Sequence, residues 1–307
     1  MLKDEPHFLR SIKSSVRNLN AYRVTQDFSR VKLNQNESPF DVPQDLKEEI
    51  SRKLLEYQWN RYPDNFASGL TAKLSAYTGF PAQGIIPGNS SNELLQALIY
   101  ATCNSGDTVV VTTPGFPIYK RIADVMDIRV REVSLRRDFS VDPGHVIAAS
   151  GGARLVVLAS PNNPTGLTVP IEDIDAIATA IDGILVVDEA YFEFCNQSAQ
   201  QLLAKHWNII VVRTFSKAFN LAGMRLGYMI GNPELMDELG KAKLPFSVGL
   251  FQQAAGETVL ENQAFVKTNV ARIISERERV ANELKSIPLL QVFPSSANFI
   301  LIRSWKV

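Results

Sequence analysis

A lysine, Lys217, lies in the stretch RTFSKAFNLAGMRLGYMIG, directly after the apolar run NIIVV. The unbroken apolar run predicts a buried strand, so the lysine falls in the loop at the carboxyl end of that strand. Thr214 and Ser216 precede it and Arg225 follows it, which surrounds the amine with hydroxyl groups and a second cation. In α/β proteins this edge of the sheet is where ligands bind. An amine held there can form an imine with an aldehyde.

Two other predicted strands end in side chains that could reach the same ligand. LVVLAS runs into PNNPTG and so places Asn163 after one strand, while ILVVD ends in Asp188, with Tyr191 shortly behind it. An amine, a carboxylate, an amide and a phenol are the groups that would be needed to bind pyridoxal phosphate. The lysine binds its aldehyde, and the carboxylate keeps its ring nitrogen protonated, so that the ring accepts electrons released at a substrate's α-carbon. Asn163 and Tyr191 are expected to hydrogen-bond the ring hydroxyl.

The phosphate of that cofactor needs cationic or amide donors. In GNSSNELL, Ser91 and Asn92 open a predicted helix, whose free N–H groups and dipole favour an anion. The hydroxyl groups and the guanidinium near Lys217 would add donors from the other side. Phe116 in TTPGFPIY, after a further strand, could stack on the ring face.

Each of these residues also has an ordinary structural role open to it. Asp188 could cap a following helix, PNNPTG could be a turn alone, and GNSSNE could be an N-cap without a ligand. Phe116 could be a core residue, Arg225 could pair with a surface acid, and Lys217 by itself reads as a solvated loop lysine. The functional interpretation is favoured because these residues occur together, in order, at strand ends.

The elements that must position these residues alternate along the chain. DTVVVTT, RLVVLAS, GILVVDEA and NIIVVRTF predict strands, whereas VPQDLKEEISRKLLEY, NELLQALIYATC and IEDIDAIATAI have helical spacing. Short apolar strands between helices predict an α/β fold with a mostly parallel sheet that helices cover on both faces. Residues 248–287 read as helical, and LQVFPSSANFILIRS alternates like strands of a smaller sheet.

These patterns predict three regions. Residues 1–44 form an N-terminal arm and part of a small α/β lobe built from both chain ends. Residues 45–250 form the large cofactor-binding domain, and residues 251–307 form a C-terminal small domain.

Composition narrows the class of function. Lys+Arg and Asp+Glu number 32 each, so there is no electrostatic case for a nucleic acid or an acidic membrane surface as partner. Two distant cysteines, Cys103 and Cys195, exclude a disulfide framework, and three scattered histidines give no metal-ligand spacing. No apolar run reaches transmembrane length. The sequence therefore predicts a cytoplasmic protein that acts on small molecules without a metal.

The chain resembles the fold-type I pyridoxal-phosphate aminotransferases of classes I and II, and among them the histidinol-phosphate aminotransferases. The resemblance rests on VRNLNAY, KLNQNESPF, NRYPD, PGNSSNELL, SPNNPTG, VVDEAYFEF, RTFSKAFNLAGMRLGY and PSSANFIL, which together cover nearly the whole chain. It implies that Lys217 is the aldimine lysine, that Asp188 pairs with the ring nitrogen, and that Asn163 and Tyr191 lie at the ring hydroxyl. It implies the following phosphate ligands: Ser91, Asn92, Thr214, Ser216 and Arg225.

The same resemblance implies a homodimer with shared active sites. Tyr62 in NRYPD matches a tyrosine that reaches the phosphate of the neighbouring subunit's cofactor. Tyr22 and Asn36 match N-terminal positions that lie near the substrate.

The reaction implied is ping-pong transamination through the Lys217 aldimine. Histidinol phosphate and 2-oxoglutarate would give imidazole-acetol phosphate and glutamate, a step of histidine biosynthesis. Three alternatives stay open: an aromatic amino-acid aminotransferase, a decarboxylase of the threonine-phosphate type, and a sensor that binds the cofactor or an amine without turnover.

The sequence departs from the family at one end. Family members continue past ANFILIR with a further strand and helix, which carry an arginine that grips the substrate's acidic group. This sequence ends at Val307, and Arg303 does not match that motif. We therefore expect an incomplete small domain, with cofactor binding retained and transamination weakened.

Overall fold

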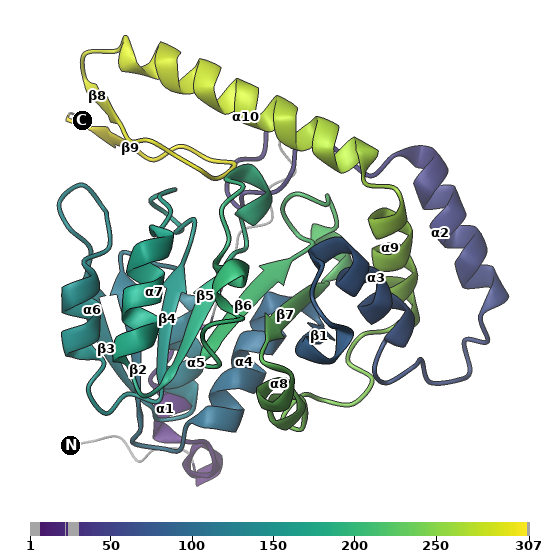
Figure 1. Ribbon diagram of the computed structural model, residues 1–307, viewed down its shortest axis with the longest axis horizontal. Helices are drawn as coiled ribbons and strands as arrows, with labels where there is room; N and C mark the ends of the chain where they lie inside the picture. Colours follow the sequence, from purple (N-terminus) through teal and green to yellow (C-terminus); the bar gives the residue numbers. More distant parts are fainter. Residues whose placement is uncertain (1–6, 22, 24–30, 306–307) are drawn as a thin grey trace.

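One mixed sheet forms the centre of the molecule (Figure 1). The computed structural model describes residues 7–21, 23 and 31–305. The strands of this sheet are β1 (Ile85–Gly88), β2 (Thr108–Thr113), β3 (Arg129–Ser134), β4 (Leu155–Ala159), β5 (Ile184–Asp188), β6 (Ile209–Thr214) and β7 (Gly227–Gly231). Their order is β1-β7-β6-β5-β4-β2-β3. Neighbours from β3 to β6 pair in parallel, whereas β7 pairs antiparallel with both β6 and β1.

The predicted mostly parallel sheet is confirmed, together with β2, β4, β5 and β6. The apolar runs did not indicate β1, β3 and β7, for local reasons. β1 is only IIPG, β3 carries exposed charged side chains in RVREVS, and β7 lies between two glycines. None of these short segments has the continuous apolar run that marks a central parallel strand.

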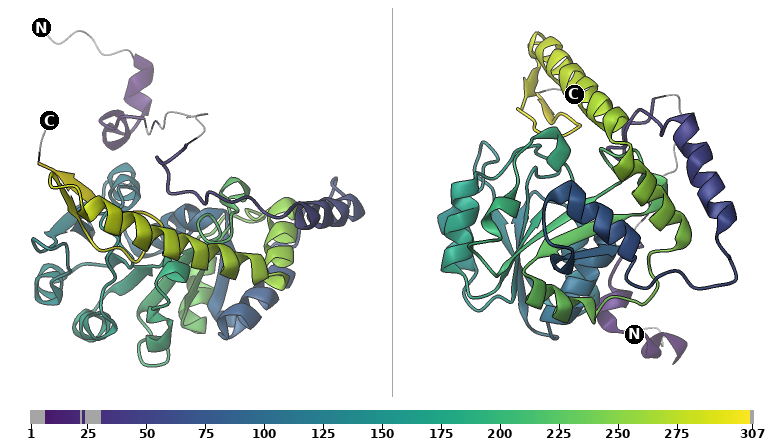
Figure 2. Two further views of the ribbon diagram at one scale, coloured as in Figure 1. Left: turned by 90° about the horizontal axis from the view of Figure 1, so that it is seen from above. Right: turned by 45° about the vertical axis from the view of Figure 1, so that its right-hand side comes forward.

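Helices cover both faces of the sheet (Figures 1 and 2). The α-helices are α1 (Ser14–Arg17), α2 (Gln44–Glu56), α3 (Ser68–Thr78), α4 (Ser90–Thr102), α5 (Ile118–Val125), α6 (Pro143–Ala149), α7 (Ile171–Ala180), α8 (Pro233–Gly240), α9 (Leu250–Glu261) and α10 (Ala264–Lys285). Short 3-10 helices are η1 (His7–Ser11), η2 (Ala82–Gly84), η3 (Phe192–Phe194), η4 (Ala199–Leu202) and η5 (Ala222–Met224). Among the described residues, no helix combines the length and apolar character needed to cross a membrane.

The sheet separates two apolar cores. In β4, Val156 and Leu158 join the core with α3, α6, α7 and α9, whereas Leu155 and Val157 join the core with α4, α5 and α8. This alternation follows from the two-residue repeat of a strand. It also decides which face each polar residue at a strand end occupies.

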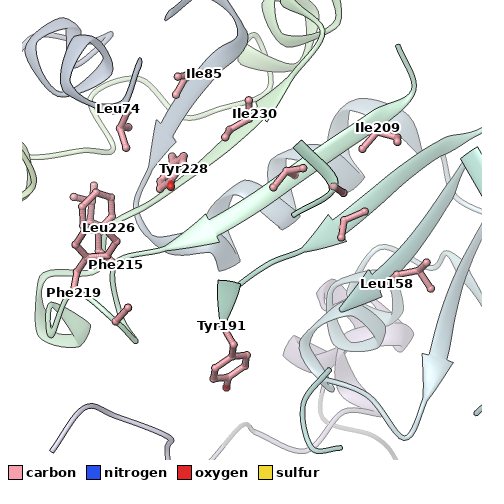
Figure 3. Close-up of a cluster of buried hydrophobic side chains, with 14 of the residues drawn as sticks. Leu74, Ile85, Leu158, Tyr191, Ile209, Phe215, Phe219, Leu226, Tyr228 and Ile230 are labelled. Carbon is pink, nitrogen blue, oxygen red and sulfur yellow. The ribbon is translucent and has the colours of Figure 1, made fainter. Parts of the chain in front are cut away.

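The loop that carries Lys217 is pinned by its neighbours. Phe215 and Phe219 are fully buried, and their ring centroids are 4.6 Å apart. Figure 3 shows both rings beside Leu226, close to Tyr228 on β7. Because close-packed side chains seldom move, this cluster fixes the backbone on both sides of the lysine.

The C-terminal region forms the predicted smaller sheet. The long helix α10 leads into β8 (Leu290–Val292), which pairs antiparallel with β9 (Ile302–Ser304) along one edge of the molecule (Figure 1). The segment between these strands returns to the large sheet, where Ser296 N donates to Gly166 O at 2.7 Å. Asn298 Nδ2 donates to Asn36 O at 3.0 Å, so this C-terminal segment also contacts the N-terminal segment that precedes α2. The division at residues 44 and 250 stays a prediction.

Candidate active site

The strand alternation puts two polar side chains on one face. Asp188 ends β5 two residues after Val186, and Thr214 ends β6 two residues after Val212; both valines belong to the core with α4 and α5. Asp188 pairs in register with Val212 of the neighbouring strand. The carboxylate and the hydroxyl therefore lie at one sheet edge, facing α4 and α5.

A cavity of about 840 Å³ opens at this edge. The predicted site residues that line it are Asn36, Ser91, Asn92, Phe116, Asn163, Asp188, Tyr191, Thr214, Ser216, Lys217 and Arg225. Tyr62 does not line this cavity; it is 82% exposed and stacks on Phe246. Tyr22 lies outside the described residues.

The Lys217 amine is half-buried within the cavity. Its Nζ donates to Gln35 O at 2.7 Å and lies 5.7 Å from the Tyr191 ring centroid. The pKa of Lys217 is lowered to about 8, mainly by burial; Glu37 opposes this shift, and Arg225 adds to it. A larger share of this amine is thus neutral and nucleophilic near pH 7 than for an ordinary lysine.

The Asp188 carboxylate is buried and held by two donors. Tyr119 OH donates to Oδ2 at 2.7 Å, and Ala190 N donates to Oδ1 at 3.0 Å. Burial raises the pKa of Asp188, and the Tyr119 hydrogen bond opposes that rise. An oriented buried carboxylate can hold a protonated ring nitrogen.

The Tyr191 phenol faces the N-terminal segment. Asn36 Nδ2 donates to Tyr191 OH at 3.1 Å, and the Phe299 ring meets the Tyr191 ring edge-on at 5.2 Å. Burial raises the pKa of Tyr191 to about 12, so the phenol keeps its proton at neutral pH and can donate it in a hydrogen bond.

The other end of the cavity is rich in donors. Ser91 and Asn92 lie in the first turn of α4, where backbone N–H groups have no partner within the helix. Thr214 Oγ1 donates to Ser216 Oγ at 3.0 Å, and an Arg225 guanidinium nitrogen donates to the same Ser216 oxygen at 3.4 Å. A helix N-terminus with hydroxyl groups and a guanidinium suits a phosphate.

Glu189 and Arg213, next to these residues in sequence, face the opposite core. Arg213 Nη2 lies 2.9 Å from Glu189 Oε2, with both side chains 3% exposed or less. Ser198 Oγ hydrogen-bonds to both partners. This pair links β5, β6 and η4 without lining the cavity.

Gln35, Glu37 and Tyr119 are among the cavity residues that sequence reasoning missed. Tyr119 lies three residues after Phe116, and the two ring centroids are 5.6 Å apart. Helical spacing from Phe116 would therefore have indicated Tyr119 as a second cavity residue. Gln35 contributes a backbone carbonyl, which no side-chain pattern can reveal.

This donor set fits pyridoxal phosphate. A partly neutral amine can take its aldehyde, a buried carboxylate can pair with its ring nitrogen, and the N-terminus of α4 can take its phosphate. Phe116 adds an aromatic wall to the same cavity.

Comparison with known proteins agrees with this chemistry. The family model "Aminotransferase class I and II" matches residues 29–307. The chain is 40% identical over 299 residues to the histidinol-phosphate aminotransferase of Chlorobium phaeovibrioides, covering 96% of this chain and 83% of that protein. It is 37% identical to the enzyme of the same name from Thermococcus gammatolerans, over 95% of this chain and 84% of that one.

A solved structure is similar as well. Histidinol-phosphate aminotransferase from Sinorhizobium meliloti, in complex with pyridoxal-5'-phosphate, superposes with a TM-score of 0.82 at 29% identity, covering 89% of this chain and 75% of that one. The fold, the cavity and these similarities together show that the chain belongs to the class I and II aminotransferases, enzymes that depend on pyridoxal phosphate.

Proposed function

We propose that this enzyme moves an amino group from histidinol phosphate to 2-oxoglutarate, in two half-reactions at one site, as a step of histidine biosynthesis. The similarity to histidinol-phosphate aminotransferases over 96% of the chain carries the choice of substrate. The half-buried amine of Lys217 beside the buried carboxylate of Asp188 supports the chemistry.

Bound pyridoxal phosphate supplies an aldehyde for amines and a ring that accepts an electron pair. In this proposal Lys217 Nζ would hold that aldehyde, and Asp188 would hold the proton on the ring nitrogen. The Lys217 amine, when it is free, would take the proton from the substrate's α-carbon. Its lowered pKa suits a general base near neutral pH.

The remaining predicted residues of the cavity would bind and orient the cofactor. Asn163 and Tyr191 would bind the ring hydroxyl, and Phe116 would pack on the ring face. The phosphate would be held by Ser91 and Asn92 in the first turn of α4 and by the donors that flank Lys217, namely Thr214, Ser216 and Arg225. Asn36, whose amide donates to Tyr191 OH, would contact the substrate.

We also propose a homodimer, supported by an exposed aromatic surface. Trp59, Tyr62 and Phe66, between α2 and α3, are 63%, 82% and 76% exposed. Trp59 packs against Phe251 at 5.9 Å, and Tyr62 stacks on Phe246 at 4.6 Å, so the surface is continuous with the start of α9. Exposed apolar surface of this kind marks an interface, here with a second copy of the chain.

Glutamate formation tests the proposed reaction. Purified protein with pyridoxal phosphate, histidinol phosphate and 2-oxoglutarate is expected to form glutamate, and Lys217→Ala is expected to form none. Phenylalanine in place of histidinol phosphate is expected to react more slowly. Faster turnover of phenylalanine would contradict the substrate choice, and release of carbon dioxide or absence of any product would contradict transamination.

A further inference from the structure

Tyr119 lines the cavity but has no role in the reaction proposed above. It lies in the first turn of α5, and its hydroxyl donates to Asp188 Oδ2 at 2.7 Å. Tyr119 is 5% exposed and Asp188 is 4% exposed, so water has little access to this hydrogen bond. A phenylalanine would fill the same space in the core without the bond.

The surroundings of Asp188 show why a donor matters there. Glu189 is the next residue along the chain and raises the pKa of Asp188, whereas Lys217, on the neighbouring strand end, lowers it. Tyr191, which lines the same cavity, is neutral at physiological pH because burial raises its pKa. Burial itself disfavours the carboxylate more than any of these groups. Hydrogen bonds from Tyr119 and Ala190 are therefore the direct support for the charged form.

A phenol supports that charge without cancelling it. A lysine or arginine in its place would form an ion pair and neutralise Asp188. Each carboxylate oxygen also accepts more than one hydrogen bond, so a bond to Tyr119 leaves acceptor capacity toward the cavity.

We propose that Tyr119 is a positioning residue that keeps the Asp188 carboxylate ionised and aimed at the ring nitrogen of pyridoxal phosphate. The inference rests on the proposed role of Asp188 and adds a residue to it. Loss of the Tyr119 hydroxyl makes Asp188 a weaker partner for a protonated ring nitrogen. The ring then withdraws fewer electrons from the nitrogen that joins it to Lys217, and that nitrogen holds its proton to higher pH.

Tyr119→Phe in the holoenzyme tests this inference. The pH midpoint of the visible absorption of bound pyridoxal phosphate is expected to rise by roughly 0.5–1 unit. We expect kcat to fall roughly 10- to 100-fold, the effect of one hydrogen bond to a charged group, with KM changed less than about twofold. Tyr100→Phe is the matched control, because Tyr100 is 46% exposed and its hydroxyl bonds to Gln96 on the same helix.

Asp188→Asn separates this inference from the proposed function. In an Asp188→Asn background, Tyr119→Phe is expected to change the midpoint little, since no charge remains to support. If Tyr119→Phe keeps the wild-type midpoint and kcat while Asp188→Asn is strongly impaired, Tyr119 has only a packing role. Equal effects of Tyr119→Phe in both backgrounds would also overturn the inference. A fully active Asp188→Asn would instead contradict the proposed role of Asp188, and the inference with it.

Discussion

At the scale of single residues, the chemistry of the cavity depends on the burial of two groups of opposite charge, the Lys217 amine and the Asp188 carboxylate. Burial lowers the pKa of Lys217 to about 8, and it raises the pKa of Asp188. Both shifts favour the neutral form of each group, and specific neighbours oppose them. Glu37 favours the charged amine, and Tyr119 favours the charged carboxylate. The neighbours, as much as the reactive groups, therefore decide the protonation states at neutral pH.

Glu37→Gln tests this balance at the amine. Removing the carboxylate, and with it the ion-pair partner of Lys32, is expected to lower the pKa of Lys217 below about 8. Because the neutral amine attacks the aldehyde, the rate of pyridoxal phosphate capture by the apoenzyme should reach its plateau at lower pH. We expect the midpoint to fall by about 0.5–1 unit.

Stopped-flow absorbance across a pH series measures that midpoint. Glu238→Gln, on α8 outside the cavity, is the control and should leave it unchanged. An unchanged or higher midpoint in Glu37→Gln would show that Glu37 does not act on Lys217.

At the scale of elements, the approach of β7 to α4 positions the phosphate end of the cavity. A Cβ at Gly227 would lie 2.5 Å from Ser91 N and 2.9 Å from Arg213 O, both of them backbone atoms. Gly227 pairs with Thr214 at the end of β6. Only a glycine lets these three backbones meet, so this residue sets the distance between the helix N-terminus and the strand-end hydroxyl.

Gly227→Ala is therefore expected to displace the first turn of α4. Overpacking against backbone costs about 1–3 kcal/mol, and we expect pyridoxal phosphate affinity to fall roughly tenfold or more. Equilibrium titration of the apoenzyme with pyridoxal phosphate measures the change. Gly151→Ala is the control, since a Cβ there meets no atom within 4 Å. Wild-type affinity in Gly227→Ala would show that this close approach does not shape the site.

Sequence patterns could predict the parallel strands β2, β4, β5 and β6 and the cavity residues that follow them, because each signal is local. Asp188 and Thr214 follow continuous apolar runs, and the two-residue repeat then fixes the face they share. Tyr119 could not be predicted as a partner of Asp188, which is 69 residues away. The position of β7 between β6 and the distant strand β1 likewise depends on packing between segments far apart in the chain, and its short sequence, which begins and ends in glycine, gives no local sign of it.

At the scale of the whole molecule, the position of Tyr62 raises the question of shared sites. Its ring stacks on Phe246, away from the cavity of its own chain. Tyr62 and Trp59 belong to the exposed aromatic surface that we assign to a second copy. In the proposed dimer, Tyr62 of one chain would reach the cofactor phosphate of the other.

Mixing two inactive variants tests this sharing. A dimer of one Tyr62→Phe chain and one Lys217→Ala chain has one site with both defects and one with neither. We expect turnover to rise when the two variants are mixed, because each mixed dimer then contains one intact site. Light scattering and exchange of a tagged subunit provide the control for assembly. Continued inactivity after proven exchange would contradict sharing through Tyr62.

The covalent link between the enzyme and its cofactor tests the central claim most directly. Borohydride reduction of the holoenzyme, followed by proteolysis and mass spectrometry, identifies the lysine that carries the pyridoxyl group. We predict that the label is found on Lys217, and that Lys217→Ala yields neither the label nor turnover. A label on a different lysine, or an active Lys217→Ala enzyme, would contradict the assignment of this cavity as the catalytic site.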